Sequence, residues 1–130
     1  MIDTIYLVPK HRKDRFNVGK IEEFLLSKPH AFRDPIISDG GPIFICGDDV
    51  SEANALRTRL VEPKGSMPVV CLVYVKADSI VIGQCVIPEH LSMCREIAQW
   101  IISNYDVEIG DEYGENWTER CSNSLDPLYE

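Results

Sequence analysis

Apolar and polar positions first predict a strand and then a helix. The apolar run over residues 4–8 is typical of a strand, and Pro9 ends it because proline has no amide hydrogen to donate. Asn17 is a suitable N-cap for a helix that extends to Lys28, since its side chain can accept a hydrogen bond from an amide of the first turn. The apolar stripe of this helix has helical spacing and consists of Val18, Ile21, Phe24 and Leu25.

The next segment has the pattern of a hairpin followed by a second helix. The turn is indicated by Asp-Gly-Gly at residues 39–41, because glycine tolerates the positive φ of tight turns. Residues 36–37 and 42–46 are the expected arms. A helix is then expected from Asp49, which has Glu52 three residues later in the manner of a capping box, to about Leu60.

The last third of the chain predicts a longer hairpin, a third helix and a short strand. Residues 69–75 and 80–87 are rich in β-branched residues and are joined by a polar turn. Pro88 is well placed at the first position of a helix whose apolar residues recur at intervals of three and four up to Asn104. Residues 107–109 form the expected final strand.

The predicted fold is α+β, in the order β-α-ββ-α-ββ-α-β. Such a string packs naturally as a two-layer sandwich, with three helices gathered on one face of a predominantly antiparallel sheet. The 130 residues and their 45% hydrophobic content suit a single domain over 1–130 with one core. Residues 120–130 are expected to form a polar C-terminal tail.

Charge narrows the classes of partner. The formal net charge is −8, and nucleic-acid binding draws most of its affinity from neutralised phosphates, so we do not expect a nucleic-acid partner. A basic protein is the more suitable partner for an acidic surface. The basic run at residues 10–15 is short and contains Asp14, and we interpret it as a solvated loop.

Apolar stretches and cysteines indicate a cytoplasmic protein. No run approaches the roughly 18 apolar residues of a membrane span, and the N-terminal apolar run lacks a basic leader, so we expect neither membrane insertion nor a signal peptide. Four cysteines lie in apolar patterns and are expected to be reduced and buried. Cys121 lies in the expected polar tail and is the candidate for a reactive thiol. The four in apolar patterns are Cys46, Cys71, Cys85 and Cys94.

The sequence contains no convincing catalytic or metal-binding motif. His90 and Cys94 are four residues apart with Glu89 beside them, but a structural zinc site needs four ligands and no second pair has suitable spacing. We therefore expect no metal and no cofactor. A nucleophile elbow and a phosphate-binding loop are also missing, so no catalytic residue is assigned and a non-catalytic role is favoured.

The segment from Asp106 to Glu119 is the candidate binding site. It has six acidic residues, no lysine or arginine, and two aromatic residues. Aromatic side chains are enriched at binding hot spots, and carboxylates around them would attract a basic partner. The alternative is that the aromatic rings fold back onto the sheet while the carboxylates remain in water. The expected partner-binding residues are Asp111, Glu112, Tyr113, Glu115, Trp117 and Glu119.

In size, charge and absence of catalytic motifs the chain is similar to the small acidic immunity proteins of bacterial toxin systems. That resemblance implies a protein that inhibits a basic toxin or enzyme through an acidic surface. One alternative is a small enzyme or ligand-binding domain with a pocket between sheet and helices, lined by His30, Asp34 or Asp39. A further alternative is an oligomerisation module that uses an exposed strand edge.

Overall fold

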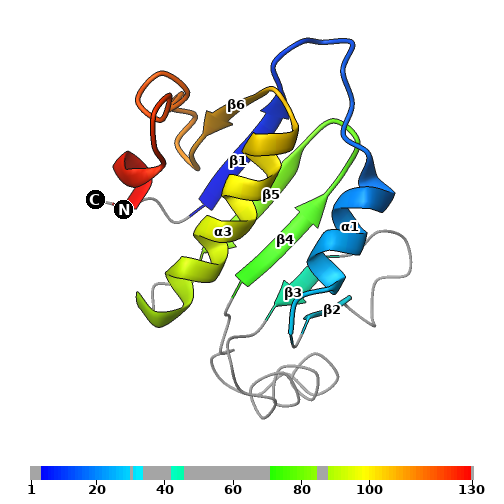
Figure 1. The fold of residues 1–130 in the computed structure, drawn as a ribbon. Helices are drawn as coiled ribbons and strands as arrows, with labels where there is room; N and C mark the ends of the chain where they lie inside the picture. The colour runs from blue at the N-terminus through cyan, green and yellow to red at the C-terminus, as the bar shows by residue number, and fades with distance from the viewer. Residues whose placement is uncertain (1–3, 30, 34–41, 46–70, 85–87, 130) are drawn as a thin grey trace.

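The computed structural model of the 130-residue chain describes residues 4–29, 31–33, 42–45, 71–84 and 88–129 (Figure 1). These residues form strands and helices in the order β1, α1, β2, β3, β4, β5, α3, β6 and the short 3-10 helix η1. Their bounds are Thr4–Pro9 for β1, Val18–Leu26 for α1, Ala31–Arg33 for β2, Ile43–Ile45 for β3, Cys71–Val75 for β4, Ile80–Gln84 for β5, Pro88–Asn104 for α3, Val107–Gly110 for β6 and Asp126–Tyr129 for η1.

The described strands form one antiparallel sheet in the order β2-β3-β4-β5-β1-β6. Helices α1 and α3 lie side by side on the same face of this sheet (Figure 1). The predicted α+β class with an antiparallel sheet is therefore confirmed. The second predicted helix, over residues 49–60, lies outside the described residues, so the total of three helices stays a prediction.

Alternation along the strands places the core between sheet and helices. In β1, Ile5 and Leu7 are buried whereas Tyr6 and Val8 face outward. The same period of two recurs in β4 and β6, as expected for a sheet with one covered face. Each fully buried aliphatic side chain of this kind contributes about 1.5–3 kcal/mol relative to an exposed one. The helices contribute Ile21, Leu25, Cys94, Ile97, Ala98 and Ile101 to this core.

Helix α1 begins as its sequence predicts. The Asn17 side chain accepts a hydrogen bond of 3.2 Å from the amide of Lys20 and so satisfies one donor of the first turn. On its inner side the helix meets α3, where the rings of Phe24 and Trp100 stack with centroids 4.0 Å apart. This contact fixes the two helices against each other over the sheet.

The first hairpin differs from its prediction. The strand that pairs with β3 is β2, with Phe32 opposite Phe44, and not the predicted arm at residues 36–37, which lies outside the described residues. Arg33 is held in place by Glu22 of α1, whose carboxylate accepts hydrogen bonds of 3.0 and 2.5 Å from the guanidinium. This ion pair links the edge strand to the helix, and such a long-range contact leaves no local signal in the sequence.

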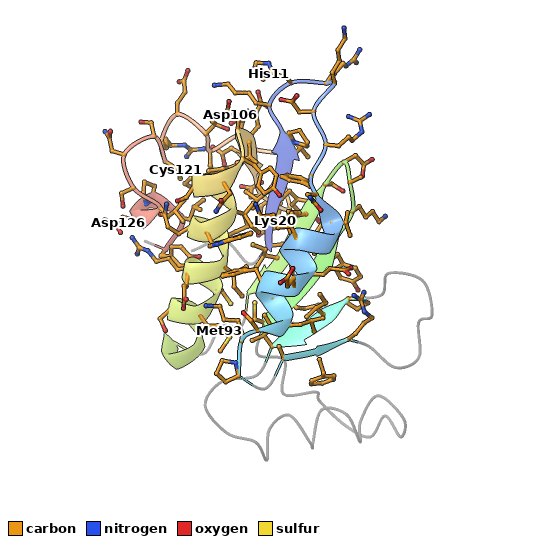
Figure 2. All side chains as sticks on the ribbon, turned by 45° about the vertical axis from the view of Figure 1, so that its right-hand side comes forward. His11, Lys20, Met93, Asp106, Cys121 and Asp126 are labelled. Carbon is orange, nitrogen blue, oxygen red and sulfur yellow. The ribbon has the colours of Figure 1, made fainter. Side chains whose placement is uncertain are left out.

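The C-terminal segment is packed and is not a polar tail throughout. Leu125 and Leu128 are buried, and an ion pair between Arg95 and Asp126 attaches η1 to α3. Figure 2 shows Asp126 and Cys121 in this segment, on the same side of α3. Cys121 is only 8% exposed, and burial raises the pKa of its thiol. The expectation that Cys121 is exposed is therefore wrong, because the segment folds back onto the core.

Candidate binding surface

The face of the sheet opposite the helices carries a row of paired positions across four strands. Tyr74 pairs with Val81, Val81 with Tyr6, and Tyr6 with Gly110, so these four positions point to the same side. Tyr6 and Tyr74 are 39% and 38% exposed. We call this side the open face. Exposed aromatic and aliphatic side chains gathered in this way are typical of interaction surfaces.

Beside the open face, the chain turns back on itself after β6 in a loop organised by Asp111. The carboxylate Oδ1 accepts hydrogen bonds from the amides of Tyr113 and Glu115 at 2.8 and 2.9 Å. Its other oxygen accepts one of 2.9 Å from the indole of Trp117. This indole hydrogen bond and the amide bonds hold the pKa of Asp111 below its usual value.

The loop also covers the outer edge of β6. The amide of Trp117 donates to the carbonyl of Ile109 at 2.7 Å, and the amide of Ile109 donates to the hydroxyl of Thr118 at 2.9 Å. Gly110 and Asn116 form an antiparallel bridge. The loop is therefore held to the sheet by backbone pairing as well as by the Asp111 carboxylate, and its position beside the open face is well defined.

Arg120 partly neutralises this acidic loop. Its guanidinium lies 3.6 Å from the ring centroid of Trp117 and forms an ion pair of 2.7 Å with Glu115. Both partners of the ion pair are largely exposed, so its contribution to stability is small. Its larger effect is positional, because the stacked guanidinium covers one side of the half-buried indole.

A hollow of about 410 Å³ lies where the loop meets the open face. Tyr6, Val8 and Gly110 supply its apolar side. The other side is acidic, with Glu108 of β6 and Glu112 and Glu115 of the loop, and it has no lysine or arginine among the lining residues that the structure describes. Asp111 and Asn116 of the loop also line the hollow. The hollow is thus apolar on one side and negatively charged on the other.

A second hollow of about 250 Å³ lies on the other side of Tyr6. It is lined by Tyr74 and Val81 of the same cross-strand row and by Lys76 and Ser79 of the β4–β5 turn. Tyr6 therefore separates two depressions on one face. A partner that covers the open face would contact this ring on both sides.

The structure brings three of the predicted binding residues to the larger hollow. Asp111, Glu112 and Glu115 line it. Tyr113 is 84% exposed at the tip of the loop, whereas Trp117 is half-buried beneath Arg120, and Glu119 is exposed beside a different depression.

Asp111 lines the hollow with little exposed area. It is only 6% exposed, and both of its carboxylate oxygens accept hydrogen bonds inside the loop, so its part in contacting a partner stays a prediction. The sequence showed an acidic residue but not the three donors that surround it.

Two residues of the surface, Tyr6 and Val8, were missed by the sequence analysis, and Glu108 was noted only as one of the six acidic residues of the candidate segment. All three point to the open face, which the alternation within their strands could have indicated, because Ile5 and Leu7 occupy the inward positions of β1. Local alternation does not reveal that Tyr6 faces Gly110 in β6, since that pairing joins residues about a hundred positions apart.

The other candidate sites gain no support. Among the described residues no three His, Cys, Asp or Glu side chains are grouped so that they could hold a metal ion. His30, Asp34 and Asp39, proposed to line a pocket, lie outside the described residues. Cys94 is buried in the core. In the described part of the chain, no helix has the length and apolar character needed to cross a membrane.

Comparison of the chain with protein-family models, curated proteins and solved structures gives no match. The chemistry of the surface is therefore the basis for the function proposed below.

Proposed function

We propose that this chain is a non-catalytic protein-binding domain that masks a basic protein, as an immunity-type inhibitor masks a cationic toxin or enzyme. The observation that supports the proposal is the hollow in which the apolar side chains of Tyr6 and Val8 meet the carboxylates of Glu108, Glu112 and Glu115. A surface with this composition can bury apolar groups of a partner and attract its positive charges at once.

The two halves of this surface have different physical roles. The exposed ring of Tyr6 offers apolar area that a partner can cover, and tyrosine is among the residues most often found at binding hot spots. The glutamates and the net charge of −8 act at longer range, because they raise the rate at which a basic partner encounters the surface. The affinity is therefore expected to fall as salt is added.

Affinity capture from the source cells, followed by calorimetry with the purified captured protein, tests the proposal. The triple variant Y6A/E112Q/E115Q removes the apolar contact and two charges. Glutamine keeps an acceptor at each glutamate position. We expect a captured protein with a basic surface whose affinity falls by about 30-fold or more in the triple variant, the scale of hot-spot losses.

A matched control comes from the helix side of the molecule. L26A/E23Q/E96Q changes one exposed apolar residue and two exposed glutamates on α1 and α3, and so alters the net charge equally. The control should bind like the unmodified chain. Equal binding by both triple variants, or an affinity that does not respond to salt, would contradict the proposed surface.

A further inference from the structure

We infer that the hollow beside Tyr6 accepts an arginine side chain of the basic partner. This inference rests on the proposed function and specifies the group that the surface recognises. Three observations support it. The hollow has a glycine, Gly110, at its floor, and carboxylates line its wall. On the same loop, Arg120 already stacks on an aromatic ring and pairs with a glutamate.

Gly110 makes room for an inserted side chain. It faces Tyr6 across the β1–β6 pair and lines the hollow. A Cβ placed on it would lie 3.6 Å from the carbonyl oxygen of Glu115 and 3.9 Å from the Cβ of Tyr6, which are ordinary contact distances. The strand therefore tolerates alanine here, and the added methyl group would reduce the hollow without disturbing the backbone.

The charges around this floor select a cation with an apolar stem. Glu108 is close to the side-chain amide of Asn116, and Glu112 accepts a hydrogen bond of 3.1 Å from the amide of Thr4, so both carboxylates are positioned at the wall. The stem of a long basic side chain would pass over Tyr6 and Val8. Its charged end would then reach the glutamates.

Arginine fits this arrangement better than lysine. Its planar guanidinium can stack on an aromatic ring and also donate paired hydrogen bonds to carboxylates, whereas an ammonium group has no plane to stack. The loop already contains one example, because Arg120 lies over the ring of Trp117 and pairs with Glu115. The hollow offers the same combination of an aromatic ring and glutamates on the side that faces a partner.

The test uses small probes and the whole chain labelled with ¹⁵N. N-acetyl-arginine amide is titrated in the millimolar range while amide chemical shifts are recorded. N-acetyl-lysine amide and the uncharged isostere N-acetyl-citrulline amide are titrated in parallel. Saturable shifts of Tyr6, Gly110 and Glu112 are expected with the arginine probe, several-fold weaker binding with lysine, and no saturation with citrulline.

Two glycine variants locate the site. G110A should weaken binding of the arginine probe several-fold because it fills the floor. G83A adds the same methyl group to the same face, but Gly83 does not line the hollow, and this variant should bind like the unmodified chain. E112Q gives a second check, because it removes charge and leaves the floor intact.

Several outcomes would overturn the arginine assignment. They are a lack of saturable shifts with the arginine probe, equal binding of lysine or citrulline, and unchanged binding in both G110A and E112Q. The proposed function can survive such a failure: if Y6A/E112Q/E115Q still abolishes capture of the basic protein while no single arginine of that protein matters, only the arginine pocket is wrong. If the arginine probe does not bind and Y6A/E112Q/E115Q still captures the basic protein as well as the unmodified chain does, the binding surface itself is refuted.

Discussion

The indole of Trp117 donates a 2.9 Å hydrogen bond to the carboxylate of Asp111, six residues earlier in the chain. Together with the two amides that donate to the other oxygen, this bond closes the acidic loop into a fixed shape. The negative surface beside Tyr6 is therefore preorganised, and binding a partner need not order it first.

Substitution of Asp111 is expected to loosen this loop and lower the melting temperature. D111A removes the acceptor of three donors and should cost several degrees, whereas D111N keeps one acceptor oxygen and should cost less. Thermal unfolding followed by circular dichroism checks this. D106A changes an exposed aspartate near the other end of β6 and should have little effect. A D111A protein as stable as the unmodified chain would show that the carboxylate does not organise the loop.

Stability should decrease in acid. The Trp117 indole hydrogen bond lowers the pKa of Asp111 from its usual 3.8, and the hydrogen bond from Arg95 lowers that of Asp126. A carboxyl group whose pKa is lower in the folded state than in the unfolded state stabilises the fold at pH values above its unfolded-state pKa. This contribution is lost as the pH falls through its folded-state pKa. Urea unfolding between about pH 6 and pH 2.5 measures this. D111N should show a smaller decrease, and an equal decrease would contradict the assignment to Asp111.

Leu128 is expected to be essential for the stability of the C-terminal segment. It is completely buried, so L128A should lower the free energy of unfolding by about 2–5 kcal/mol through lost burial and the cavity left behind. Denaturant titration checks this. L26A removes the same atoms from a site that is 41% exposed and should change the free energy by less than about 0.5 kcal/mol. Similar losses in both variants would mean that η1 is not packed against the core.

Cys121 should react slowly with thiol reagents in the folded protein. It is buried, and its raised pKa keeps it a thiol, the less nucleophilic form, near neutral pH. Iodoacetamide labelling followed by peptide mass spectrometry should modify it far faster in denaturant than in buffer. L128A, which loosens the same segment, should accelerate labelling without denaturant. Immediate labelling of the unmodified folded chain would refute the packing described for residues 121–129.

Local patterns were enough to predict most described elements. Asn17 begins α1 and Asn104 ends α3 as expected, because caps and apolar periodicity act over a few residues. The strand that pairs with β3 was misplaced: it is β2, whose Arg33 also forms an ion pair with Glu22 of α1, and such contacts between separate elements are not visible in local patterns. Polar composition likewise concealed the inward packing of Leu125 and Leu128.

The candidate site was predicted only in part for the same reason. An excess of acidic residues near Trp117 is visible in the sequence, and Glu112 and Glu115 do face the hollow. Whether a given carboxylate faces solvent or bonds to its own loop depends on donors that folding brings to it, as for Asp111. Tyr6 lies at the candidate site because β1 pairs with β6, which places Tyr6 opposite Gly110, and this pairing is not visible in the local sequence.

The pairing of Gly110 with Asn116 and the Thr118 hydroxyl on the Ile109 amide have a consequence for how copies of this chain meet one another. A bare strand at the border of a sheet invites a neighbouring molecule to extend it, which is the first step of many fibrillar aggregates. Here the loop that follows β6 already occupies backbone hydrogen-bonding groups at the outer edge of β6. The molecule can therefore leave tyrosines exposed on the adjacent face while the β6 edge of its sheet resists edge-to-edge pairing with another copy.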